Sequence, residues 1–291
     1  MKKLIIIFIV CLSILSCTKM DREKIVDKKD LTGADYRLFQ NTPAWELAKA
    51  VWDEDVSKIN EIVSKNKQLI NYQEPIYGRT VLILTVSNQQ YESFEDLLGA
   101  RADVNIHDTY DGTSALIESC IFRDYETRYA ELLLQNGANV NDVEVGERRK
   151  GNSTRFTPLM AAAKTGKLDL VDLLLKKGAN INYQNEFKQT ALSEAVLTER
   201  YNIALYLLKH GADYKKPIFY REEENKEMYL VDVLREDFFD LDSKEYEEKQ
   251  EIVTFLRGKG IEYKQVPIPE YIKKRAQENY PDNWKEYLEK Y

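Results

Sequence analysis

The fold is decided by the stretch TPLMAAAKTGKLDLVDLLLKKGANIN, residues 157–182. Thr157 can cap a helix with its hydroxyl, and Pro158 suits the first helical position because an N–H there would have no partner. Gly166 ends this helix, and apolar residues then recur at helical spacing. Gly178 supplies the left-handed residue that stops the second helix. We therefore predict two short antiparallel helices, whose narrow apolar faces need copies of the unit on either side.

Copies of this unit recur along the chain. The start of the first helix is repeated in Thr80-Val81-Leu82, Ser114-Ala115-Leu116 and Thr190-Ala191-Leu192. The end of the second helix is repeated at Ala102 with Asn105, Gly137-Ala138 with Asn141, and Gly211-Ala212. Leu159 and Leu192 lie 33 residues apart, as do Ala179 and Ala212. A constant period of this length predicts a stacked array rather than two compact domains.

The period and these motifs resemble the ankyrin repeat, with its Thr-Pro-Leu-His and Gly-Ala signatures. The resemblance covers most of residues 42–263. It implies an all-α ankyrin-repeat solenoid of about six helix-turn-helix repeats with β-hairpin-like fingers and divergent end repeats. The family histidine is absent, and its positions hold Ile83, Ile117, Met160 and Ser193. Because ankyrin arrays serve mainly as binding scaffolds, the resemblance implies a binding protein.

The beginning of the chain has the features of an export signal. Lys2-Lys3 precede an uncharged apolar run, residues 4–15, which is too short to span a membrane but typical of a secretory signal. The run ends in Ile14-Leu15-Ser16-Cys17, which resembles a bacterial lipobox and implies cleavage before Cys17 and lipid attachment to it. An ordinary signal peptide with a chance cysteine is the alternative. We expect a signal peptide at residues 1–16, a flexible tether at 17–35, and a membrane-anchored lipoprotein on the periplasmic or surface side.

The array is expected at residues 36–263 and a C-terminal helical cap at 264–291. In the divergent first repeat, residues 45–51 and 59–63 carry the two apolar faces; in the degenerate last repeat, residues 229–234 and 252–256 do so. An insertion at 144–154 has a basic tip, Arg148-Arg149-Lys150, which is either a solvated loop or a partner-contacting finger. Aromatic residues of the cap either pack on the last repeat or bind a membrane surface.

Charge and cysteine content narrow the classes of partner. The formal net charge is −7, and removal of Lys2 and Lys3 with the signal makes it −9. Such an acidic chain is poorly suited to bind nucleic acid. Cys11 would leave with the signal and Cys17 would carry lipid, so Cys120 alone remains and no intramolecular disulfide can form. We expect Cys120 to be a small buried residue.

The sequence offers no recognised catalytic or cofactor motif. It contains no P-loop, no Gly-x-Ser-x-Gly and no dinucleotide fingerprint. One mature cysteine and two histidines, His107 and His210, cannot form a standard zinc site. We therefore predict no catalytic residue, no metal and no cofactor, and expect a protein that is not an enzyme.

The expected function is that of a membrane-tethered scaffold that binds an unknown protein through the concave face of the array. The alternative is a periplasmic inhibitor or immunity protein that blocks an enzyme, because the acidic surface would suit a cationic target. The family's contact positions fall on Tyr77, Arg79, His107, Tyr110, Phe122, Phe156, Lys164, Gln184 and Phe187. Among these, Tyr110, Phe156 and Phe187 occupy successive fingers and should form one exposed strip, unless some of them pack a finger against its helix.

Overall fold

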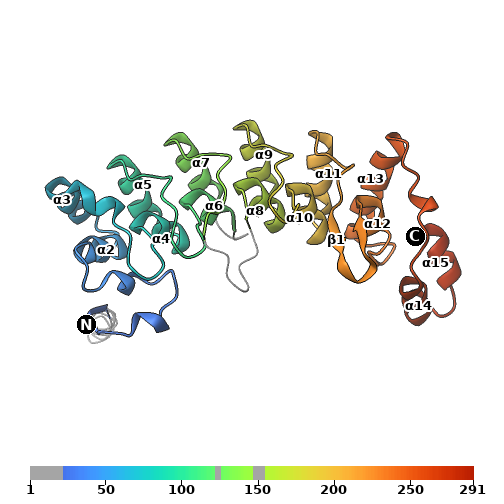
Figure 1. Cartoon of the computed structure of the whole chain (residues 1–291), viewed down its shortest axis with the longest axis horizontal. Coiled ribbons are helices and arrows are strands. Elements are labelled where there is room, and N and C mark those ends of the chain that lie inside the picture. Colours follow the sequence, from blue (N-terminus) through green and yellow to red (C-terminus); the bar gives the residue numbers. More distant parts are fainter. Residues whose placement is uncertain (1–21, 122–125, 147–154) are drawn as a thin grey trace, which may run out of the picture. The chain divides into compact units, whose positions relative to one another are not determined.

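The computed structural model describes residues 22–121, 126–146 and 155–291. Cys17, Phe122 and the basic tip at 148–150 therefore lie outside the described residues. The chain divides into two compact units, Met1–Ala115 and Leu116–Tyr291. The predicted all-α class is confirmed, since nearly all regular structure is helical and the sole sheet of the described residues has two short strands (Figure 1).

The first unit consists of helix pairs preceded by short turns of helix. Its elements are η1 (Lys28–Asp30), η2 (Tyr36–Phe39), α2 (Trp45–Trp52), α3 (Val56–Lys65), η3 (Lys67–Asn71), α4 (Val81–Ser87) and α5 (Tyr91–Gly99). In each pair we call the first helix inner and the second outer. The apolar faces predicted for the divergent first repeat are confirmed, because Leu47 of α2 and Ile59 of α3 are fully buried.

The segment before the first repeat is packed rather than free. Leu31 is buried, and its carbonyl accepts a hydrogen bond of 2.8 Å from the Tyr77 hydroxyl. The Lys28 ammonium donates to the carbonyls of Leu38 and Gln40 at 2.6 Å each. The expected flexible tether over 17–35 is therefore wrong for residues 22–35. Its many charged residues suggested a solvated chain, but Arg22 and Glu23 pair with Asp53 and Lys49 of the first repeat.

The second unit continues the helix pairs and ends in a cap. Its elements are α6 (Ala115–Ile121), which begins at the boundary, α7 (Thr127–Gln135), α8 (Pro158–Thr165), α9 (Leu168–Lys176), α10 (Ala191–Leu197), α11 (Tyr201–Lys209), β1 (Phe219–Arg221), η4 (Glu222–Glu224), β2 (Lys226–Met228), α12 (Leu230–Leu234), α13 (Lys244–Gly258), η5 (Tyr263–Gln265), α14 (Glu270–Asn279) and α15 (Trp284–Lys290). Inner helices α8 and α10 are direct neighbours, and each packs on its own outer helix (Figure 1).

The predicted helix boundaries of the deciding stretch are confirmed. The Thr157 hydroxyl accepts a hydrogen bond of 3.2 Å from the Met160 backbone N–H, and Pro158 begins α8. Gly166 and Gly178 both have positive φ angles, 79° and 90°, where a side chain would strain the backbone. The apolar face of α9 is buried, with Leu174 fully inaccessible.

Within each unit, asparagine side chains link successive repeats. The side-chain oxygen of Asn71 accepts from the backbone N–H of Asp103 at 2.9 Å in the first unit. In the second unit Asn182 accepts from Asp213 at 2.8 Å and donates to the Gly211 carbonyl at 3.2 Å. These bonds satisfy backbone groups that the short loops leave without helical partners.

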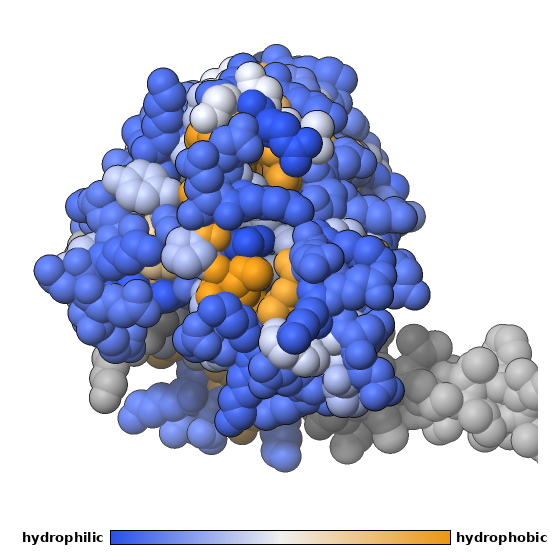
Figure 2. Space-filling view, turned by 90° about the vertical axis from the view of Figure 1, so that its right-hand side faces the viewer, coloured by the Kyte–Doolittle hydropathy of each residue, from blue (hydrophilic) through white to orange (hydrophobic). Residues whose placement is uncertain are grey.

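Helices α14 and α15 close the second unit around a small core of Ile272, Ala276, Tyr287 and Tyr291. The Tyr291 hydroxyl donates toward the carbonyls of Arg235 and Asp237, at 3.0 and 2.6 Å. The buried Lys249 ammonium lies 3.9 Å from the centre of the Tyr291 ring, and burial lowers the pKa of this lysine below its usual value. Figure 2 looks onto this end, where apolar surface gathers in a hollow among hydrophilic side chains.

Candidate binding surface on the fingers and inner helices

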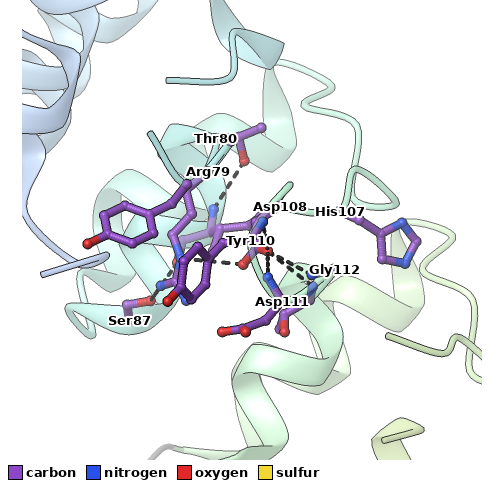
Figure 3. A network of polar contacts seen from close by, with 12 residues as sticks. Arg79, Thr80, Ser87, His107, Asp108, Tyr110, Asp111 and Gly112 are labelled. Atoms are coloured by element: carbon purple, nitrogen blue, oxygen red, sulfur yellow. Dashed lines mark hydrogen bonds and ion pairs between the residues drawn. The ribbon is translucent and has the colours of Figure 1, made fainter. Parts of the chain in front are cut away.

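A carboxylate holds the second finger of the first unit in shape. One oxygen of Asp108 accepts hydrogen bonds from the backbone N–H groups of Tyr110, Asp111 and Gly112, at 3.1, 2.8 and 2.9 Å (Figure 3). The other oxygen lies 3.5 Å from Nε of Arg79. Because the Asp108 carboxylate is fully buried, these contacts fix the finger tightly.

Other fingers repeat this device with different acceptors. The Glu74 carboxylate accepts from the backbone N–H groups of Ile76 and Tyr77, at 2.7 and 2.8 Å. In the second unit the Asn185 side chain accepts from Phe187 at 3.0 Å. Sequence reasoning missed these acceptors. The signal was present, since Glu74 and Asp108 each precede the start of the next helix by the same spacing.

The two fingers of the first unit touch each other. The Thr109 N–H donates to the Tyr77 carbonyl at 2.8 Å, and the rings of Tyr77 and Tyr110 meet edge to face at 5.1 Å. Gly78 permits this approach, because a Cβ there would lie 2.4 Å from the Thr109 hydroxyl oxygen, and its φ is +70°. Tyr110 remains 39% exposed, and Ile76, next to Tyr77 in the sequence, is 41% exposed.

Three predicted contact residues of this unit serve the fold. Tyr77 is tied to the segment that precedes the first repeat through its hydroxyl. Arg79 pairs with Asp108 and donates to the Ser87 hydroxyl at 3.1 Å. His107 forms the antiparallel bridge with Ser114 at the base of the finger. Of the four positions predicted here, Tyr110 is the one that the structure leaves most exposed.

The prediction of an exposed aromatic strip is wrong at Phe156, whose side chain is only 7% exposed. Its backbone N–H donates to the Glu144 carboxylate at 3.0 Å, and the Lys164 ammonium lies 4.7 Å from its ring centre. The ring thus packs between the finger and α8, which was the alternative left open by the sequence. Lys164 itself is exposed.

Phe187 lies on a finger of the second unit and is 38% exposed. Beside it the Gln184 amide donates to the Lys188 carbonyl at 2.9 Å, so Gln184 helps to close the finger. Leu197, at the end of inner helix α10, is 45% exposed and was not among the predicted contact residues. Phe187 and Leu197 are the large apolar side chains that this finger and helix leave exposed.

A carboxyl group is buried on the same inner helix. Glu194 of α10 is 4% exposed, and its Oε1 has no hydrogen-bond partner within the described ranges. Burial raises the pKa of Glu194, while the charge of Lys164 opposes that shift. The inner-helix surface therefore holds one poorly solvated acid beside an exposed cation.

The described part of the chain contains neither a cluster of metal-ligating side chains nor an exposed thiol. No group of three or more His, Cys, Asp or Glu side chains there is placed to hold a metal ion. Cys120 is fully buried, and burial raises the pKa of its thiol to about 12. A thiol with so high a pKa is almost entirely protonated at neutral pH and hence a poor nucleophile.

Comparison with known proteins agrees with this architecture. Residues 141–217 match the family model of ankyrin repeats in three copies. The chain contains ankyrin repeats. An ankyrin repeat protein of Acanthamoeba polyphaga mimivirus is 34% identical over 83 residues, which cover 28% of this chain and 49% of that protein. A fowlpox virus ankyrin repeat protein is 31% identical over 159 residues, 53% of this chain and 43% of that protein.

Longer proteins share the repeats as one part of their length. The ankyrin repeat and KH domain-containing protein mask-1 of Caenorhabditis elegans is 40% identical over 195 residues, 60% of this chain but 7% of that protein. The aligned parts span about half or less of these curated relatives. The likeness thus concerns the ankyrin array.

Proposed function

We propose that this chain is a scaffold that binds a protein partner through its finger tips and inner helices. The observation that carries the proposal is the exposure of large apolar side chains on rigidly held fingers, Tyr110 and Ile76 in the first unit and Phe187 in the second. Partner contacts are often made by loops that a rigid scaffold positions. The ankyrin repeats support the same function, since such arrays act mainly as binding surfaces.

Rigidity adds to the argument. Asp108 and Asn185 fix the backbone beside Tyr110 and Phe187, so little conformational entropy is lost when these tips are covered. An exposed aromatic residue on a fixed backbone is the kind of side chain that dominates binding energy at interfaces.

A pull-down from membranes with residues 22–291 would test this proposal. We expect a partner that the wild-type chain retains and that both Tyr110→Ala and Phe187→Ala release. Tyr271→Ala is the matched control, because Tyr271 is 54% exposed on α14, outside the fingers. Equal retention of the partner by all variants would contradict binding through the fingers.

We further propose that the scaffold is tethered to a bacterial membrane through lipid on Cys17. The support is the sequence of residues 2–17, with its positive start, apolar run and terminal cysteine. No helix in the described ranges is long and apolar enough to cross a membrane. Cys17→Ala should abolish metabolic labelling with radioactive palmitate, whereas Cys11→Ala, in the same apolar run, should not. Undiminished labelling of Cys17→Ala would contradict the anchor.

The acidic net charge of −7 supports a narrower version of the proposal, in which the partner is a cationic enzyme that the array blocks. Two results would favour an inhibitor over a passive scaffold. Binding of the enzyme should weaken steeply with salt, and the bound enzyme should lose its activity.

A further inference from the structure

A groove of about 920 Å³ lies between outer helices α11 and α13 of the second unit. Its lining includes none of the finger residues described above, so binding in this groove would be independent of the proposed protein partner. Its volume falls within the range typical of pockets for small molecules. The residues that line it come from one face of each helix and from Leu241 of the preceding loop.

The floor of this groove is apolar. Leu205 of α11 is buried, while Leu241 and Phe255 are half-buried. Gly258 of α13 also lines the groove, and a Cβ added there would meet no atom within 4 Å. A larger side chain at this position would therefore enter open space beside the helix. An apolar ligand that covers this floor would remove its surface from water, which is favourable.

Three donor groups at the groove, on Gln250, Lys209 and Lys259, have no acceptor among the described residues. The Gln250 amide nitrogen is buried and has no hydrogen-bond partner among the described residues. Lys209 and Lys259, from the ends of α11 and α13, form no ion pair within the same ranges. The Lys259 ammonium lies 5.4 Å from the centre of the Phe255 ring, next to the apolar floor. Two lysines without an ion pair among the described residues favour a ligand with an anionic group.

Positive and negative side chains lie at opposite ends of the groove. Lys209 and Lys259 mark one end, and the exposed Glu247 and Glu251 of α13 lie toward the other. Glu251 and Lys259 are eight residues apart, about 12 Å along a helix axis. A ligand with an anionic head and an apolar chain would place its head by the lysines and its chain on the floor.

We propose that this groove binds an amphiphilic carboxylate, a molecule with one apolar chain and one carboxylate head group. Lys209 and Lys259 attract the carboxylate. Leu205, Leu241 and Phe255 cover the chain. A helix from a partner protein is the competing occupant, but it offers no single anionic head to place beside the two lysines.

Isothermal titration calorimetry with dodecanoate below its micelle concentration tests the proposal. We expect binding by residues 22–291, and affinity about tenfold lower for Lys209→Gln and for Lys259→Gln, since each loses a charge-assisted contact. Lys177→Gln is the matched control, because Lys177 caps α9 and does not line the groove. Gly258→Trp should fill the groove and abolish binding, with an unchanged circular dichroism spectrum as evidence that the variant folds.

Uncharged and cationic amphiphiles of equal chain length complete the test. Dodecan-1-ol and dodecyltrimethylammonium should both bind more weakly than dodecanoate, because neither carries an anionic head for Lys209 and Lys259. The proposal is overturned if dodecanoate does not bind, if folded Gly258→Trp binds it as the wild type does, or if either other amphiphile binds equally well. If dodecanoate does not bind, a protein helix becomes the favoured occupant of the groove.

Discussion

At the scale of single residues, the fingers depend on a few buried acceptors. The Asp108 carboxylate accepts hydrogen bonds from four successive backbone N–H groups and faces Arg79, so Asp108→Ala leaves these donors without their acceptor. We expect this change to lower the free energy of unfolding by about 1–3 kcal/mol. Urea unfolding followed by circular dichroism measures it, with Glu92→Ala as the control, since Glu92 is an exposed acid on α5. Equal midpoints for both variants would refute the structural role of Asp108.

Glu194 gives a second prediction at this scale, concerning pH. Burial raises its pKa in the folded protein, so the folded state holds a proton that the unfolded chain releases more easily. The contribution of Glu194 to stability is thus greatest below its unfolded pKa, ordinarily near 4.3, and is lost as pH rises through its folded pKa. Glu194→Gln should stabilise the protein at pH 7 by on the order of 1 kcal/mol and change it less at pH 4. A stabilisation that is the same at both pH values would contradict this account.

At the scale of elements, stability comes from the outer-helix faces. Leu174 of α9 is fully buried, whereas Leu168 of the same helix is 40% exposed. Leu174→Ala should lower the free energy of unfolding by about 2–5 kcal/mol, through lost burial and a residual cavity. Leu168→Ala should change it by less than about 1 kcal/mol. Thermal melting of both variants checks the comparison, and similar losses would show that the buried face of α9 is misplaced.

The same elements show how far sequence reasoning reaches. Thr157, Pro158 and Gly178 fixed the boundaries of α8 and α9 because capping and left-handed backbone depend on local residue type. Burial of Phe156 depends on where Lys164 and Glu144 lie in space, which no local pattern records. The packed segment at 22–35 escaped prediction for the same reason, since the Gln40 amide and the Tyr77 hydroxyl reach its backbone carbonyls from other parts of the chain.

At the scale of the whole molecule, each of the two units combines helical repeats with one exposed aromatic finger tip, Tyr110 or Phe187. A strip of Tyr110, Phe156 and Phe187 was expected, yet Phe156 is withdrawn into the finger base while the other two stay exposed. Each unit therefore offers its own exposed aromatic tip, Tyr110 in the first and Phe187 in the second. Two separate tips can each contribute to affinity independently when they are far apart and share no contacts.

This arrangement predicts different outcomes for the three aromatic residues. Tyr110→Ala and Phe187→Ala should each weaken binding of the captured partner by about 1–3 kcal/mol, as truncated interface anchors do. Both should leave the free energy of unfolding within about 1 kcal/mol of wild type, because these side chains are largely outside the core. Phe156→Ala should instead destabilise the fold by about 3–5 kcal/mol, as expected for loss of a buried ring.

Titration of the partner and chemical unfolding, performed on all three variants, separate these roles. Tyr271→Ala again serves as the exposed aromatic control outside the fingers. If Tyr110→Ala or Phe187→Ala destabilised the fold while affinity stayed constant, that residue would be structural and the partner would bind elsewhere. If each weakened binding and the double variant weakened it by the sum of the two effects, the partner would span both units, because additivity is expected of distant sites within a single interface.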